Sequence, residues 1–134
     1  MQADFHDAHD RHWLDAEVLY RHGRWANADH LYGMAAECGL KRIMLVFDMP
    51  YDSIKDRPSK ANDCKHVDAI WVRFESYAKG RSDYVLLDNP FTGWDVSQRY
   101  AHRSNFTQAY VDPHRQGAEQ VRKLVQNAKR DGLI

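Results

Sequence analysis

The residues best suited to chemistry lie in one short segment late in the chain. This segment places two guanidinium groups, an imidazole and an amide within seven positions, directly after Trp94: Arg99, Tyr100, His102, Arg103 and Asn105. Guanidinium groups bind phosphate through paired hydrogen bonds, and an imidazole can move protons near neutral pH. The segment therefore predicts a phosphate-binding or acid–base site, with an ordinary solvated helix face rich in Arg and His as the alternative.

A second candidate is Glu37, which lies between Ala36 and Cys38 in the most apolar part of the sequence. A bare carboxylate in such surroundings is costly, so Glu37 needs a charged partner or an opening to solvent. Lys41 follows one helical turn later, in the favourable Glu-then-Lys order. The two residues predict either a structural ion pair or a binding carboxylate in a cleft.

Histidines and aspartates alternate at the start of the chain, and both residue types bind zinc or nickel: Asp4, His6, Asp7, His9, Asp10 and His12. At three-residue steps the histidines turn by about 60° around a helix each time, so two could share a metal but three hardly could. We therefore predict a solvated helix start and neither a metal site nor a cofactor. The cysteines, Cys38 and Cys64, are not at metal-ligand spacing either.

Apolar residues at helical spacing predict two helices, which carry the N-terminal histidines and the pair Glu37 and Lys41. The first should cover residues 4–22 and end at Gly23, in the left-handed conformation that closes many helices. The second should cover residues 25–47 and be the central helix, because apolar or small residues occupy most of its circumference. The turn between them is so short that the two helices should be antiparallel. Gly33 and Gly39 predict close packing there against another backbone.

The rest of the chain is marked by glycine, proline and capping residues. Its expected parts are a surface loop at 48–62, a third helix capped by Asn62 or Asp63 and closed by Gly80, an unassigned segment 81–111, and a last helix that begins at Asp112 and Pro113 and ends at Gly132. The apolar run 84–87 fits a strand or a helix equally well. Overall, the pattern predicts an all-α fold, a single-domain antiparallel bundle of four to five main helices over residues 1–134.

Composition limits the classes of partner. The chain has 134 residues, 43% of them hydrophobic, and its 19 Lys and Arg balance its 19 Asp and Glu. It therefore has no global charge to attract nucleic acid or a membrane surface. No apolar run approaches the roughly 18–20 residues of a membrane span, and two cysteines predict a cytoplasmic protein. Residues 99–134 carry seven Lys and Arg against three acids, which predicts a basic C-terminal face.

Residues 13–41 carry a more specific pattern. An Asp-Ala-Glu step and a Gly-Arg turn precede a run of small, polar and apolar positions: Asp15, Ala16, Glu17, Gly23, Arg24, Ala28, His30, Gly33, Ala35, Glu37, Cys38, Leu40 and Lys41. This pattern resembles the N-terminal half of HEPN-domain proteins, small helical bundles of prokaryotic defence and toxin–antitoxin systems. Trp71 and the segment from Trp94 to Tyr100 resemble family positions less specifically. The resemblance implies a HEPN-like bundle that could pair as a homodimer.

The resemblance also implies two functions. HEPN enzymes cleave RNA without metal, through an arginine followed a few residues later by a histidine, and Arg99 and His102 would be these catalytic residues if the chain is an RNase. Their separation by only two residues departs from the family pattern. The other function is a non-catalytic protein, of the antitoxin or toxin-immunity type, that binds a protein partner. The balanced charge and the shortened motif favour this binding function over the enzyme.

The binding function would use residues from several parts of the chain. Its candidates are the 48–62 loop, the basic C-terminal face and four side chains: Glu37, Lys41, Arg103 and Asn105. RNA is the alternative partner. A strong salt dependence of RNA binding would then be expected, because phosphate contacts release counterions.

Overall fold

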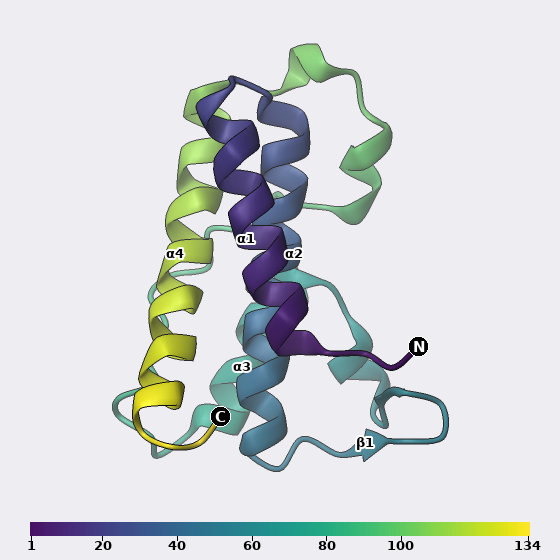
Figure 1. The fold of residues 1–134 in the computed structure, drawn as a ribbon, viewed down its shortest axis with the longest axis vertical. Helices are drawn as coiled ribbons and strands as arrows, with labels where there is room; N and C mark the ends of the chain where they lie inside the picture. The colour runs from purple at the N-terminus through teal and green to yellow at the C-terminus, as the bar shows by residue number, and fades with distance from the viewer.

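The computed structural model describes residues 1–134 and contains four long helices and one small sheet. The helices are α1 (Phe5–Arg21), α2 (Trp25–Val46), α3 (Val67–Ala78) and α4 (Gln108–Arg130). α1, α2 and α4 lie side by side along the long axis of the molecule, and α3 packs on the lower half of α2 (Figure 1). The prediction of an all-α, single-domain helical bundle is therefore confirmed. No helix is both long enough and apolar enough to cross a membrane.

The first two helices begin and end where the sequence predicts. The Asp4 carboxylate caps α1 by accepting the backbone N–H groups of His6 and Asp7, each at 3.0 Å. Gly23 has a φ of +66°, the left-handed conformation expected after a helix. The chain then reverses into α2, which contacts α1, α3 and α4 and is the central helix of the bundle.

Gly33 and Gly39 do allow close packing on α2, but the atoms nearest to them belong to side chains and not to the other backbone that the spacing predicts. A Cβ atom on Gly33 would lie 2.2 Å from Cε2 of Trp94. A Cβ atom on Gly39 would lie 2.6 Å from Cγ1 of Val121 and 2.7 Å from Nδ1 of His9. Each glycine therefore makes room for a particular side chain, which the spacing of small residues could not specify.

The predicted loop at 48–62 contains short regular elements. β1 (Tyr51–Asp52) pairs antiparallel with β2 (Arg57–Pro58), and a 3₁₀ helix, η1 (Ala61–Cys64), follows. The predicted cap of α3 at Asn62 or Asp63 is wrong, because His66 occupies the N-cap position. The buried Asp63 carboxylate instead accepts hydrogen bonds from Nε of Arg73 and from the Tyr77 hydroxyl, both at 2.6 Å. It thereby ties η1 to the side of α3.

The predicted start of the last helix at Asp112 and Pro113 is also wrong. α4 begins at Gln108, and the Thr107 hydroxyl caps it by accepting the N–H of Tyr110 at 3.2 Å. Pro113 lies inside the helix near its N-terminal end, where proline removes a hydrogen bond and is better tolerated than in a helix centre. Asp112 is free for a tertiary contact, and its carboxylate accepts the Tyr20 hydroxyl at 2.6 Å.

The unassigned segment 81–111 is mostly irregular. It contains two 3₁₀ helices, η2 (Val96–Tyr100) and η3 (Arg103–Asn105), and the apolar run 84–87 is neither helix nor strand. Figure 1 shows the η2–η3 part projecting beside the upper end of the bundle, near the α1–α2 turn. This segment carries the Arg and His cluster that the sequence singled out.

Candidate anion-binding site

Trp94 and Gln98 attach the η2 segment to α2. The Trp94 indole fills the space over Gly33, stacks on His30 at 5.8 Å between ring centroids, and donates its Nε1–H to the Asp29 carbonyl at 3.2 Å. The Gln98 side-chain amide donates to the Asp29 carboxylate. These contacts fix the position of Arg99, the residue after Gln98.

The buried Asp29 carboxylate also binds α4. It accepts the Nδ1–H of His114 at 2.6 Å, and neither side chain is more than slightly exposed. Phe91 stacks on the His114 ring, with centroids 5.2 Å apart. Asp29 therefore joins α2, η2 and α4 in one hydrogen-bonded network. Sequence reasoning missed it, although an acid next to Ala28 in an apolar pattern was the same signal that identified Glu37.

A pocket of about 340 Å³ lies between the α1–α2 turn and the η2–η3 segment. Both of these segments lie at the upper end of the bundle (Figure 1). It is lined by Gly23, Arg24, Trp25, Ala26, Asn27, Arg99, Ala101 and Arg103. Three of these eight residues are arginines and none is acidic. The pocket is therefore a concave, positively charged site built from two segments that are distant in the sequence.

The three arginines are not used in ion pairs. Elsewhere in the molecule, Arg73, Arg115 and Arg122 each contact a carboxylate at 3.0 Å or less. No such pair involves the pocket arginines, and Arg99 only places its guanidinium 4.8 Å from the centre of the Tyr100 ring. These guanidinium groups therefore keep their hydrogen-bond donors available for a ligand.

The beginning of α2 adds to the positive character of the pocket. Arg24 occupies the N-cap position and provides no side-chain acceptor, and the first turn contains no acidic residue. The backbone N–H groups of Trp25, Ala26 and Asn27 are therefore uncapped, and the helix dipole adds partial positive charge there. The arrangement suits an anion with several oxygen atoms, above all a phosphate group.

The structure brings together only part of the predicted cluster. Arg99 and Arg103 both line the pocket, whereas His102 does not. Nδ1 of His102 accepts the Ser104 N–H at 3.2 Å and lies 2.8 Å from its hydroxyl, and Asn105 donates to the His102 carbonyl at 3.0 Å. Arg24, the third pocket arginine, was missed as part of this site because only the fold brings it to the η2–η3 segment.

Glu37 and Lys41 form the ion pair that their spacing predicts. Nζ of Lys41 lies 2.7 Å from Oε1 of Glu37, and both residues are buried. The second carboxylate oxygen accepts a hydrogen bond from Nδ1 of His66 at 3.1 Å. Both oxygens of Glu37 are thus engaged, and neither Glu37 nor Lys41 lines the arginine pocket.

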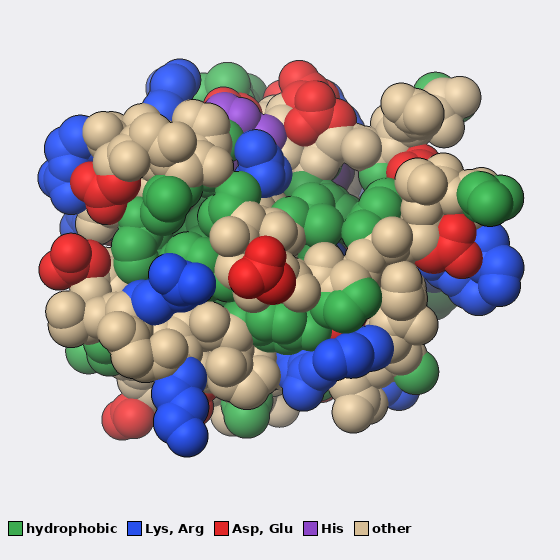
Figure 2. All heavy atoms as spheres, turned by 90° about the horizontal axis from the view of Figure 1, so that it is seen from below, with side chains coloured by type: hydrophobic (Ala, Val, Ile, Leu, Met, Phe, Trp, Pro, Cys, Tyr) green, Lys and Arg blue, Asp and Glu red, His purple; other side chains and the backbone are tan.

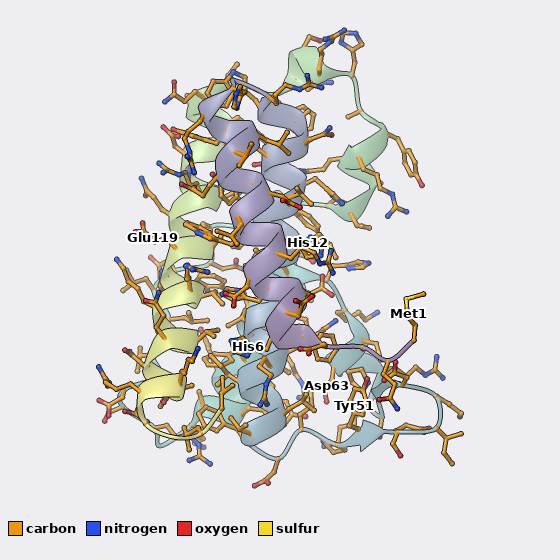
Figure 3. The ribbon with its side chains drawn as sticks, in the orientation of Figure 1. Met1, His6, His12, Tyr51, Asp63 and Glu119 are labelled. Atoms are coloured by element: carbon orange, nitrogen blue, oxygen red, sulfur yellow. The ribbon has the colours of Figure 1, made fainter.

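The N-terminal histidines do not converge. His6 and His12 lie apart on α1 (Figure 3), while His9 between them is buried and donates its Nδ1–H to the Ala35 carbonyl at 2.7 Å. The structure contains no group of three or more His, Cys, Asp or Glu side chains arranged to hold a metal ion.

The opposite end of the bundle has a different character. Figure 2 looks at this end and shows hydrophobic side chains gathered near its centre, with charged side chains around them. A hollow of about 370 Å³ lies between the end of α3 and the following loop, lined in part by Ala78, Tyr84 and Val85. A larger, open cleft of about 1010 Å³ runs from this loop to α4 and includes Val72 and Leu87.

Comparisons of the chain with protein-family models, with curated proteins and with solved structures gave no match. The resemblance of residues 13–41 to HEPN-domain proteins therefore stays a prediction, and the function must be argued from the geometry of the pocket.

Acid is expected to destabilise the fold. Burial lowers the pKa of His9, His12 and His30 below the ordinary value for histidine, and Nε2 of His9 is buried without a partner. The unfolded chain then takes up protons at these groups at a higher pH than the folded chain. Their stabilising effect is complete above about pH 6.5 and is lost as the pH falls toward the lowered pKa values.

Urea denaturation between pH 8 and pH 5 would measure this loss, and the NMR signal of the His9 ring would report its protonation. We expect the His9 ring to remain neutral at a pH at which a histidine of the unfolded chain would already be charged. A free energy of unfolding that rises as the pH falls from 7 to 5.5 would contradict the prediction.

Proposed function

We propose that this chain is a non-catalytic binding protein that holds RNA by its phosphate groups in the arginine pocket. The observation that carries the proposal is the convergence of three arginines without ion pairs, Arg24, Arg99 and Arg103, on one pocket that contains no acid. A guanidinium group offers a planar fork of donors that matches phosphate, and it remains charged at all relevant pH values. The resemblance to HEPN-domain proteins supports RNA as the phosphate-bearing ligand.

Binding has more support than cleavage. Metal-independent RNA cleavage needs a group that moves protons near the scissile phosphate, usually a histidine. No histidine lines the pocket, and His102 is hydrogen-bonded to Ser104 outside it. The pocket therefore offers charge and hydrogen-bond donors without an acid–base partner.

The biological setting that we propose is a bacterial conflict system of the toxin–antitoxin or immunity type, as the resemblance implies. A protein partner in such a system would need a second surface. The exposed residues Val72 and Leu87, which are 60% and 74% exposed, favour the cleft between α3 and α4 for that contact. A cytoplasmic location and a homodimer also stay predictions.

Single-arginine variants test the RNA-binding proposal. Arg24→Ala, Arg99→Ala and Arg103→Ala are each expected to weaken binding of a short labelled RNA by roughly 10- to 100-fold, because each removes charge-assisted hydrogen bonds to phosphate. Each variant should also lower the slope of log affinity against log salt by about one. Fluorescence anisotropy over a range of salt concentrations measures both quantities.

Arg130→Ala is the matched control, because Arg130 is an exposed arginine at the other end of α4 that contacts only Asp131. We expect this variant to bind RNA like the wild type. Equal losses in Arg130→Ala and in the pocket variants, or no binding by the wild type, would overturn the proposal. To detect any metal-independent cleavage, the RNA is incubated in EDTA with the wild-type protein and, separately, with the His102→Ala variant.

A further inference from the structure

The donors and charge of the arginine pocket, together with the aromatic ring beside it, indicate the kind of RNA that the pocket suits. This inference rests on the function proposed above. We infer that the pocket takes the terminal phosphate of a single strand, with Tyr100 as the platform for the neighbouring base. Three features lead to this ligand: the number of donors in the pocket, the concentration of three unpaired cations in it, and the exposure of Tyr100.

The donors in the pocket exceed what an internal phosphate can accept. An internal phosphodiester carries one negative charge and two free oxygens, whereas a terminal phosphate carries about −1.5 to −2 charges and three strong acceptor oxygens. Arg24, Arg99 and Arg103 each offer five N–H donors, and the uncapped N–H groups of α2 add more. The terminal phosphate is the better match in both charge and acceptors.

The charge balance of the pocket points the same way. Three cations share a pocket of about 340 Å³ that contains no carboxylate to offset their mutual repulsion. Arg99 also lies close enough to His30 for its charge to help lower the pKa of His30, after the larger effect of burial. A ligand with nearly two negative charges relieves this repulsion more fully than a ligand with one.

Tyr100 provides a surface for a base beside the pocket. Its side chain is 79% exposed, and the Arg99 guanidinium lies 4.8 Å from the ring centre. An exposed aromatic ring next to a phosphate site is the usual means of stacking an unpaired base. Bases inside a duplex are already stacked and paired, so this platform favours a single strand.

Binding assays with matched oligonucleotides test the inference. One short RNA sequence is compared with a 5′-phosphate, a 3′-phosphate or hydroxyl groups at both ends, together with its duplex and with inorganic phosphate as a competitor. We expect one of the two terminal phosphates, 5′ or 3′, to raise the affinity at least roughly tenfold over the hydroxyl form. The phosphorylated form that does so shows which end of the strand is bound. Arg99→Ala and Arg103→Ala should abolish that preference.

Tyr100 variants test the base platform separately. Tyr100→Ala should weaken binding of the single strand by roughly 5- to 100-fold, the effect of one base stack, and leave the affinity for inorganic phosphate itself unchanged. Tyr100→Phe should bind like the wild type, because the ring alone stacks. Because the side chain is exposed, circular dichroism should show that both variants fold normally.

The outcomes separate this inference from the proposed function. If RNA binds through the three arginines but phosphorylated and hydroxyl ends bind equally, the inference is overturned and the proposed function stands. Duplex binding as tight as single-strand binding, or no effect of Tyr100→Ala, overturns the base platform. If no RNA binds, or inorganic phosphate alone binds as tightly as the RNA, both the function and the inference are overturned.

Discussion

Glu37→Ala is expected to lower the free energy of unfolding by about 3–5 kcal/mol, because it leaves a buried cation without its partner. The Lys41 side chain is only 6% exposed, and its one acceptor is Oε1 of Glu37 at 2.7 Å. The substitution also removes the acceptor of His66, which lies at 3.1 Å from the other carboxylate oxygen. Urea denaturation at neutral pH, followed by circular dichroism, measures the change.

Two controls separate burial from pairing. Glu119 and Lys123 form a pair of the same spacing, 3.9 Å apart, but their side chains are 54% and 69% exposed. Glu119→Ala should therefore change the stability by less than about 0.5 kcal/mol. The double variant Glu37→Met with Lys41→Met should recover most of the loss, since an apolar pair of similar size can replace a buried ion pair.

A loss below about 1 kcal/mol in Glu37→Ala would show that Glu37 is not the counter-charge of a buried lysine. The alternative that the sequence left open, a binding carboxylate in a cleft, would then regain support. Comparison with Lys41→Met alone would distinguish the two cases, because that variant leaves the carboxylate as the unpaired charge.

Gly33→Ala is expected to destabilise the fold by about 1–3 kcal/mol through overpacking. The added Cβ would lie 2.2 Å from Cε2 of Trp94, a separation that forces the rigid indole to move. The indole is also held by its hydrogen bond to the Asp29 carbonyl, so it cannot shift without losing a second contact. Alanine gains about 1 kcal/mol of helix propensity over glycine, which offsets only part of this cost.

The same substitution is expected to weaken RNA binding. Trp94 attaches the segment that carries Arg99 and Arg103, so its displacement moves one wall of the pocket away from Arg24. Tryptophan fluorescence would report the altered indole environment, and anisotropy would report the RNA affinity. Gly93→Ala is the matched control, since a Cβ there meets nothing within 4 Å. Equal effects of Gly33→Ala and Gly93→Ala would contradict the packing argument.

Local interactions allowed the sequence to predict much of the fold. Asp4 caps α1 through N–H groups two and three residues away, and Gly23 supplies the positive φ that ends the helix next to it. The Glu37 and Lys41 pair is likewise local, because residues four apart meet on one face of a helix. For such features the residues that decide the structure are neighbours in the sequence.

The start of α4 and the cap of α3 could not be decided in this way. Asp112 with Pro113 and Thr107 are both acceptable helix starts by local rules, and the Tyr20 hydroxyl engages Asp112 from α1. Asn62 and Asp63 are acceptable caps, but Arg73 and Tyr77 bind the Asp63 carboxylate from the side of α3. Competing local signals of similar strength are resolved only by such tertiary contacts.

The candidate site likewise combines residues that the local sequence singles out with residues that only the fold brings together. The sequence by itself predicted Arg99 and Arg103 as members of a phosphate-binding or acid–base cluster, and Glu37 as an acid in apolar surroundings that needs a partner. Only the tertiary structure placed Arg24 opposite the two arginines and left His102 outside the pocket. The physical reason is that residue type and spacing define what a side chain can do, whereas packing of Trp94 over Gly33 decides which side chains meet.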